Sequence, residues 1–187
     1  MHFTHIISDT HFHHEKIISL GERPFKSVRD MNEALVSNWN AVVPEDGVVL
    51  HLGDFSHDDV PLEAIRQVRS RLNGRILITL GNHDFPEVLV EAGVVELSDL
   101  RLWFRTPDKD VVFSHFPLEP ALLYSGRVSV HGHTHGPDPI LDPDLHPGAV
   151  SVNCELTGYA PLTRDEVMRQ VQRAQSRVGT SWLSRTR

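Results

Sequence analysis

The chain has 187 residues, a mass of 21.1 kDa and a formal net charge of −7 at pH 7. This length suits one domain with a sizeable core, which we place at residues 1–187. The 40% hydrophobic and 23% charged fractions exclude a disordered chain. No apolar run approaches the roughly 18 residues of a membrane span, and the N-terminus lacks the pattern of a signal peptide. The single cysteine excludes an internal disulfide framework, so we expect a cytoplasmic protein without a membrane partner.

The charge is unevenly distributed along the chain. The overall acidic balance does not favour a broad nucleic-acid-binding surface. The segment from about residue 163 to 187 is basic, because it contains six arginines and only two acidic residues, Asp165 and Glu166. A solvated helix face with a frayed end accounts for this segment, and a phosphate-rich partner is the alternative.

Short runs rich in Val, Ile and Leu alternate with amphipathic segments along the chain. Several runs are continuously apolar, which indicates strands buried on both faces. The predicted strands are Phe3–Ser8, Val48–Leu52, Ile76–Leu80, Val111–Ser114, Val128–Val130 and Ala149–Val152, with Leu97–Phe104 as a weaker candidate.

Helical periodicity predicts three helices. An apolar stripe indicates a helix over residues 30–43, which Pro44 ends, and a second stripe indicates a helix over residues 62–72. Thr163-x-x-Glu166 is a capping box that opens the third. Strands that alternate with helices predict an α/β layered fold, with either two packed sheets or one large mixed sheet. The proline-rich segment 136–148 is predicted to be an ordered surface loop.

Five of the predicted strands end in polar residues that can bind metals. They carry Asp9 and His11, Asp54, Asn82 and His83, His115, and His133 and His135. Ligands of α/β sheets bind beyond the carboxyl ends of the strands, so we expect these side chains to share one crevice. Mixed carboxylate and imidazole donors suit Mn, Fe, Zn, Co or Ni. So many ligands exceed the needs of one tetrahedral ion and suit two ions that share a bridging carboxylate.

Each motif alone carries little weight, because an Asp-x-His or Gly-Asp pair often only forms a turn. Among the 13 histidines, we expect His51 and His131 to lie in the core or behind the ligands. Solvation at the surface accounts for His2, His57 and His146. The occurrence of all five motifs in order, each at a strand end, is what indicates a functional site.

The series Asp9-x-His11, Gly53-Asp54, Gly81-Asn82-His83-Asp84, His115 and Gly132-His133-x-His135 resembles the calcineurin-like metallophosphoesterase superfamily. The resemblance covers about residues 3–161, and the segments 8–14, 23–25 and 51–55 are similar to a small bacterial and phage branch without a cap domain. It implies a four-layer αββα sandwich of two mixed β-sheets flanked by helices.

The resemblance also implies a role for each motif residue. Asp9, His11 and His135 would hold a first metal ion, Asn82, His115 and His133 a second, and Asp54 would bridge the two. His83 would be the general acid beside the leaving group. The implied cofactors are two divalent transition-metal ions, with Mn as the first choice and Fe, Zn, Ni or Co as alternatives. His14 is the candidate substrate-binding residue, ahead of His13 and Arg23, and Asp84 either orients His83 or caps a turn.

The expected function is hydrolysis of phosphate esters by a metal-bridged hydroxide, with a histidine as general acid. A phosphodiester is the preferred substrate, because a short chain without a cap leaves the site open; a nucleotide is one candidate. Phe55 follows Asp54 where protein phosphatases continue with Asp-Arg-Gly, which argues against that class. A phosphomonoesterase, a nuclease and a metal-binding protein-interaction scaffold are the alternatives, and His83 favours an enzyme. The natural substrate and the oligomeric state stay open.

Overall fold

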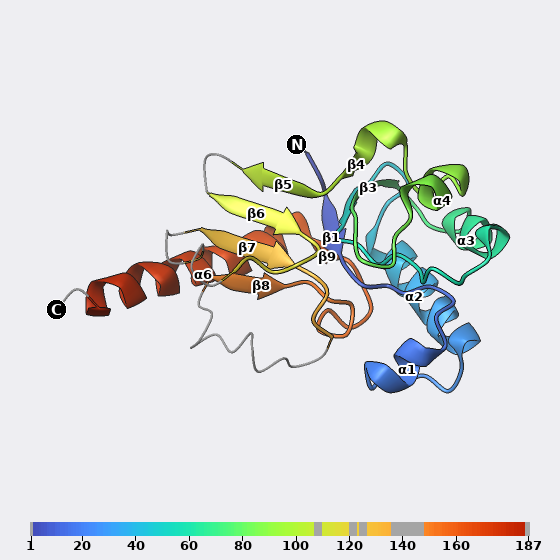
Figure 1. Cartoon of the computed structure of the whole chain (residues 1–187), viewed down its shortest axis with the longest axis horizontal. Helices are drawn as coiled ribbons and strands as arrows, with labels where there is room; N and C mark the ends of the chain where they lie inside the picture. The colour runs from blue at the N-terminus through green and yellow to red at the C-terminus, as the bar shows by residue number, and fades with distance from the viewer. Residues whose placement is uncertain (1, 107–109, 120–122, 124–126, 136–147, 186–187) are drawn as a thin grey trace.

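The computed structural model describes residues 2–106, 110–119, 123, 127–135 and 148–185, with side chains as far as Val178. Two sheets form its centre (Figure 1). The strands are β1 (His5–Ile7), β2 (Val48–His51), β3 (Arg75–Thr79), β4 (Leu100–Arg101), β5 (Trp103–Thr106), β6 (Val111–Ser114), β7 (Val128–His131), β8 (Ala149–Ser151) and β9 (Leu162–Thr163). The first sheet has the order β4-β3-β2-β1-β9, and the second has the order β5-β6-β7-β8.

Both sheets are mixed. In the first sheet β1, β2, β3 and β4 pair in parallel, and β9 joins β1 in the antiparallel direction. In the second sheet β6, β7 and β8 are parallel, and β5 is antiparallel to β6. The predicted fold class, two mixed sheets with helices, is therefore confirmed.

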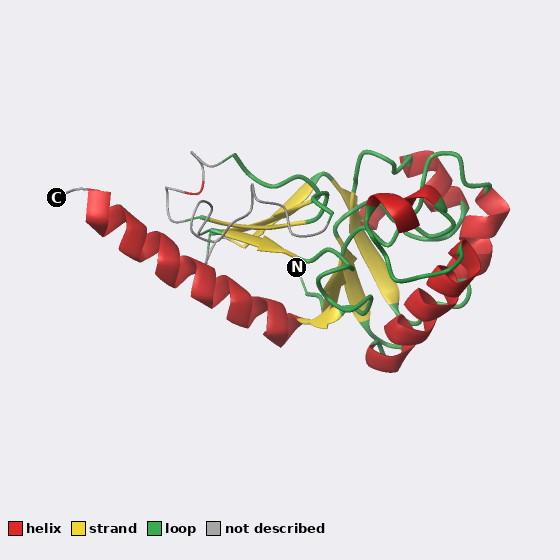
Figure 2. Cartoon of the chain, turned by 90° about the horizontal axis from the view of Figure 1, so that it is seen from below, coloured by secondary structure: helices red, strands yellow, loops and turns green. Residues whose placement is uncertain are grey.

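The helices are α1 (Lys16–Leu20), α2 (Val28–Val42), α3 (Leu62–Arg69), α4 (Pro86–Glu91) and α6 (Arg164–Arg185). Figure 2 shows α6 running along the second sheet, while the other helices gather on the far side of the first sheet. The predicted capping box opens α6: Thr163 N donates to Glu166 Oε2, and Glu166 N donates to Thr163 Oγ1. None of the described helices combines the length and apolarity that a membrane crossing requires. Exposed Arg169 and Arg173 fit the predicted solvated face of the basic segment.

Two apolar clusters hold the layers together. One joins β1, β2 and β3 to α2 and α3, and Trp39 of α2 is the largest side chain buried in it. The other joins the opposite face of the first sheet to β6, β7 and β8 and to the buried face of α6. The central strands β1, β2 and β3 are buried on both faces, which explains why their sequences are mostly apolar.

The prediction of one strand over Leu97–Phe104 is wrong. The chain forms a 3₁₀ turn at Leu97–Asp99, pairs with β3 as β4, and then enters the second sheet as β5. The run looked like a strand because it is apolar, yet Leu102 is 70% exposed at the point where the chain passes from one sheet to the other. The predicted loop 136–148 lies outside the described residues except for Gly148.

Replacing Trp39 tests the helix-side core. Trp39 is buried, and its indole Nε1 donates to the carbonyl of Asn73 at 3.0 Å. We expect Trp39→Ala to lower the free energy of unfolding by about 3–5 kcal/mol, because it leaves a cavity. Leu20→Ala, at a 72% exposed site on α1, is the control and should change it by less than about 0.5 kcal/mol. Equal urea midpoints for the two variants would show that Trp39 does not hold this core together.

Candidate metal centre at the strand ends

The carboxyl ends of β1, β2, β3, β6 and β7 bring the predicted site residues together. Three donor atoms from three of these ends form a nearly equilateral triangle. Asn82 Oδ1 lies 3.0 Å from His115 Nε2 and 3.0 Å from His133 Nδ1, and the two imidazole nitrogens are 3.1 Å apart. Bonds of about 2.1 Å at right angles to one cation would place neighbouring donors about 3 Å apart.

The tautomer of His115 shows why its Nε2 and the Asn82 oxygen cannot hydrogen-bond to each other. Its Nδ1 lies 2.9 Å from the carbonyl of Leu52, so that nitrogen carries the proton of the neutral ring. Its Nε2 therefore presents a lone pair to the lone pairs of Asn82 Oδ1. Two facing lone pairs repel, so the donor set fits a cation.

A second donor set lies beside the first. His11 Nε2 is 3.2 Å from His135 Nε2, and Asp9 Oδ1 is 3.7 Å from the same His135 nitrogen. Asp54 lies between the sets: its Oδ2 is 3.4 Å from His11 Nε2 and 3.6 Å from His115 Nε2. The seven side chains that the sequence predicts as ligands thus lie in one continuous cluster.

The backbone of the cluster is strained where the donors sit. Asp9, His11, Asp54 and His133 all have φ values between 48° and 68°, in the left-handed region that residues with side chains rarely adopt. Gly53, at φ 90°, precedes Asp54, and a Cβ on it would lie 2.6 Å from the backbone nitrogen of Gly81. Such strain persists only where the surroundings hold it, and it concentrates at functional sites.

Burial controls the protonation of these groups. It raises the pKa of Asp9 to about 8, and the charge of His135 and a hydrogen bond from Ser8 offset this only in part. Burial also holds the pKa of His11 well below its usual range, with help from His135 and Arg23, and it lowers the pKa values of His115 and His133. These imidazoles are therefore neutral near pH 7, as metal ligands must be.

The similarity to known proteins identifies the family. The family model of the calcineurin-like phosphoesterases matches residues 4–137, more than half of the chain. The chain belongs to this family. The family expected from the order of the motifs is thus confirmed, and membership supports hydrolysis of phosphate esters.

Relatives of this calcineurin-like phosphoesterase occur in archaea and phage. An uncharacterized protein of Methanocaldococcus jannaschii is 31% identical over 90% of this chain and 91% of its own length. The Gene 66 protein of Mycobacterium phage L5 is 27% identical over 88% of this chain and 91% of its own length. A crystal structure of a protein of unknown function from Aquifex aeolicus has the same fold, with a TM-score of 0.69 and 23% identity over 89% of this chain and 98% of that one.

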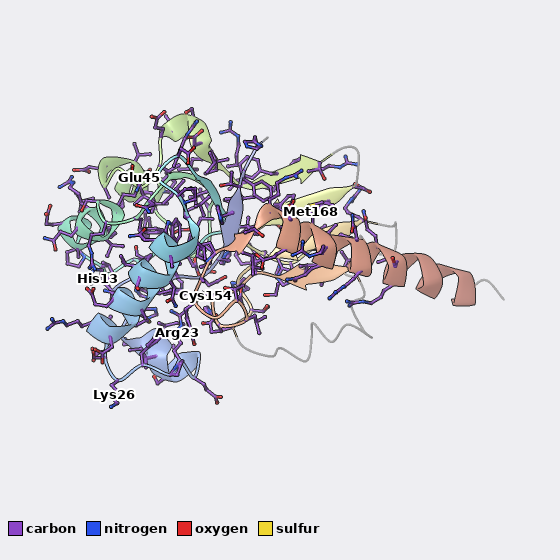
Figure 3. The ribbon with its side chains drawn as sticks, turned by 180° about the vertical axis from the view of Figure 1, so that it is seen from behind. His13, Arg23, Lys26, Glu45, Cys154 and Met168 are labelled. Carbon is purple, nitrogen blue, oxygen red and sulfur yellow. The ribbon has the colours of Figure 1, made fainter. Side chains whose placement is uncertain are left out.

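Glu155 and Arg23 support the phosphoesterase site from behind. Glu155 Oε1 accepts a hydrogen bond from His135 Nδ1 at 2.9 Å, which leaves His135 Nε2 facing Asp9 and His11. Arg23 Nη2 lies 2.8 Å from the same carboxylate and donates to the carbonyl of Asp9 at 2.7 Å. Cys154, close to Arg23 in Figure 3, also donates to the Asp9 carbonyl. Burial raises the pKa of Glu155, but the His135 hydrogen bond and the Arg23 charge outweigh it and lower the pKa to about 2.

Neither of these supporting roles is predicted from the sequence. Arg23, a candidate for substrate contact that ranked behind His14, is 4% exposed and donates to backbone carbonyls, so it lies in a supporting position. His13, proposed with it, lies between α2 and α3, where its backbone nitrogen donates to Asn32 (Figure 3). Glu155 follows β8 in the sequence Asn-Cys-Glu, and no known motif spacing identifies it as a functional residue. Its acidic side chain three residues beyond a predicted buried strand end was the only signal available.

Four imidazoles line one end of the centre. The His14 ring lies 4.0 Å from that of His57, and the His57 ring lies 4.4 Å from that of His83. The His83 ring is 5.5 Å from that of the predicted ligand His11. Burial and the neighbouring His57 and His83 lower the pKa of His14 to about 4. The prediction that His57 is only a solvated surface residue is wrong, because it packs between His14 and His83.

Contacts decide the roles of the remaining motif residues. The carboxylate of Asp84 accepts hydrogen bonds from the backbone nitrogens of Asp54, Phe55 and Gly81. Asp84 therefore caps two loops, which is the second of the two roles considered for it. His51 and His131 are buried, as expected for residues in strand runs, and Cys154 is buried as well. His146 lies outside the described residues.

A change at Glu155 tests the support behind His135. We expect Glu155→Gln to weaken binding of Mn²⁺ about 10- to 100-fold, because the variant loses the charge that fixes the His135 tautomer. Titration calorimetry of the metal-free protein measures this. Glu45→Gln, at an exposed carboxylate labelled in Figure 3, is the matched control. Unchanged Mn²⁺ affinity in Glu155→Gln would contradict the role.

Proposed function

We propose that this protein is a dinuclear-metal-dependent phosphodiesterase. The observation that carries the proposal is the pair of neighbouring donor sets on either side of the Asp54 carboxylate, in one of which the His115 lone pair faces Asn82 Oδ1. Asp9, His11 and His135 would hold one ion, and Asn82, His115 and His133 the other. Imidazole, carboxylate and amide donors together suit Mn, with Fe, Zn, Co and Ni as alternatives. When bound, two such ions supply a water of lowered pKa and neutralise charge on the phosphoryl oxygens.

His83 is the proposed general acid. Its backbone nitrogen donates to Asp54 Oδ1 at 3.0 Å, which fixes the residue beside the shared carboxylate. Its side chain is 31% exposed and its Nδ1 lies 3.9 Å from Asp58 Oδ1. A separate group of possible donors, His57, Asp58 and His83, includes it, but neither donor set beside Asp54 does, so we assign its Nε2 to a bound ester. There the imidazolium donates its proton to the departing alkoxide. His14 and His57 pack against the ring and limit how far it turns.

The openness of the centre supports a diester substrate. Asn82 is exposed, and His83, His133 and His135 are half-buried, so solvent reaches the donor atoms directly. A phosphodiester has two organic groups on one phosphorus, and such a site has room for both. A phosphomonoester would leave one side of the centre without a contact.

Hydrolysis of bis-p-nitrophenyl phosphate and of p-nitrophenyl phosphate tests the proposal. With Mn²⁺ we expect faster turnover of the diester and no turnover in the presence of a chelator. In His83→Ala, kcat for the diester should fall by about 10²–10⁴, with two Mn²⁺ ions still bound. His2→Ala, at an exposed imidazole, is the matched control.

Three results would count against this proposal. Preference for the monoester would make the protein a phosphatase. Full activity of His83→Ala would remove the acid role. No turnover of either ester by protein that holds two ions would favour a protein-interaction scaffold.

Asp54 provides a separate test of the shared carboxylate. We expect Asp54→Asn to bind at most one Mn²⁺ per chain and to lose turnover, because both donor sets lose a charged oxygen. Elemental analysis after gel filtration counts the ions, and Asp46→Asn, at an exposed carboxylate, is the control. Two ions at full occupancy in Asp54→Asn would show that the carboxylate is not shared.

A further inference from the structure

An apolar groove of about 460 Å³ lies on the second sheet beside the metal centre. This volume falls within the range of small-molecule sites. Leu102, Trp103 and Phe116 contribute large apolar side chains that are 70%, 58% and 50% exposed. Val112 and Ser114 of β6 lie at its floor, on the opposite face of the strand from the buried Val111 and Phe113. Exposed aromatic side chains gathered in a groove mark a binding site more often than a solvated surface.

The groove opens onto the proposed metal ligands. The Phe116 ring lies 4.6 Å from the ring of His133 and 4.8 Å from that of His115. The turn that carries Phe116 is held by Ser114 Oγ, which donates to the Phe116 carbonyl at 2.7 Å. The next residues are tied to β7, because Leu118 N donates to Ser129 Oγ at 3.1 Å. The wall is therefore fixed by hydrogen bonds at both ends.

The charges around the groove are compensated. Arg105 and Arg127 line it and both pair with Asp110, at 2.8 Å and 3.1 Å, and Glu119 adds a second carboxylate to the lining. The positive charges of the two arginines are therefore largely balanced by carboxylates of the same chain. An additional phosphate group would find no unpaired arginine among the described residues that line the groove, whereas a flat ring finds the faces of Trp103 and Phe116. The groove favours a neutral aromatic group over an anion.

The groove and His83 lie at different ends of the centre. The His83 ring contacts the rings of His11, His14 and His57, whereas Phe116 contacts those of His115 and His133. If His83 protonates the departing oxygen, the leaving group lies at the His11 end. A group that reaches the Phe116 end is then the one that stays bonded to phosphorus.

We propose that the groove of Leu102, Trp103 and Phe116 binds a flat aromatic ring, as in a nucleoside, on the ester arm that a phosphodiester keeps after hydrolysis. This inference rests on the proposed function and adds the class of its substrate. It also gives a physical reason for diester preference, because a monoester has no second arm to place in the groove.

Three substrates with one leaving group test the groove. They are the p-nitrophenyl diesters of phosphate whose second arm is methyl, phenyl or 5′-thymidine. Stacking of the second arm on an aromatic side chain should raise kcat/KM. We expect the phenyl and thymidine esters to have values at least about fivefold higher than the methyl ester. In Trp103→Ala this ratio should fall towards one, and in Leu20→Ala, at an exposed leucine on α1, it should stay as in the wild type. The ratio is read rather than the absolute rate, because the leaving group and the metal centre are the same for all three esters.

Each outcome either supports the groove or overturns it. A gain for the thymidine ester alone supports the proposal and narrows the ring to a nucleobase. Equal rates for all three esters in the wild type, or an unchanged ratio in Trp103→Ala, would overturn it. A dimer that dissociates in Trp103→Ala while the ratio stays the same would overturn it in favour of a second copy of the chain on this face; sedimentation velocity detects that case.

A binding measurement keeps the proposal testable if no ester is turned over. Calorimetry of Mn²⁺-loaded protein compares thymidine 5′-phosphate with methyl phosphate, the products that keep each arm. We expect at least about fivefold tighter binding of thymidine 5′-phosphate, and loss of that difference in Trp103→Ala. Failure of hydrolysis with this difference retained would count against the proposed function and not against the groove. Equal affinities would overturn the groove.

Discussion

Repulsion between facing lone pairs is the constraint around which the centre is built. The Leu52 carbonyl accepts a hydrogen bond from His115 Nδ1, so the opposite nitrogen of that neutral ring has only a lone pair to offer. This lone pair faces Asn82 Oδ1 at 3.0 Å. Burial lowers the pKa of His135, but the Glu155 hydrogen bond and the Asp9 charge outweigh it and raise that pKa. Burial also raises the pKa of Asp9 to about 8, so its charged form needs a cation nearby. A cation would relieve both penalties, and its binding would then stabilise the fold.

Distant parts of the chain hold this unfavourable arrangement in place. Arg23 donates to the carbonyls of Asp9 and Thr10, and the Asp84 carboxylate accepts hydrogen bonds from the backbone nitrogens of Asp54 and Phe55. These buried ionic contacts clamp the turns in which Asp9 and Asp54 adopt positive φ. The apolar clusters on both faces of the first sheet offset the free-energy cost of this strain, because their packing fixes where the strands end.

The strand ends and their polar residues could be predicted from the sequence, because buried strands and the motifs after them are local patterns. The seven predicted ligands lie together for that reason, although their role as ligands stays a prediction. Glu155, Arg23 and His57 act through contacts between residues up to 132 positions apart, which no periodicity encodes. The division of Leu97–Phe104 between two sheets could not be predicted for a similar reason. Leu102 and Trp103 are apolar, as residues of a buried strand are, yet both are exposed.

The two sheets divide the work around the proposed centre. The loops after β2 and β3 carry Asp54 and His83, so the proposed proton donation to a leaving group would depend on the first sheet. The loop after β6 carries Phe116, and β5 carries Trp103, so contact with a retained ester arm depends on the second. A substitution in β5 can therefore change which diester binds without moving the donor atoms of His83. The same reasoning explains why apolar side chains remain exposed on this face: they lie where an organic group of the substrate, rather than another part of the chain, would cover them.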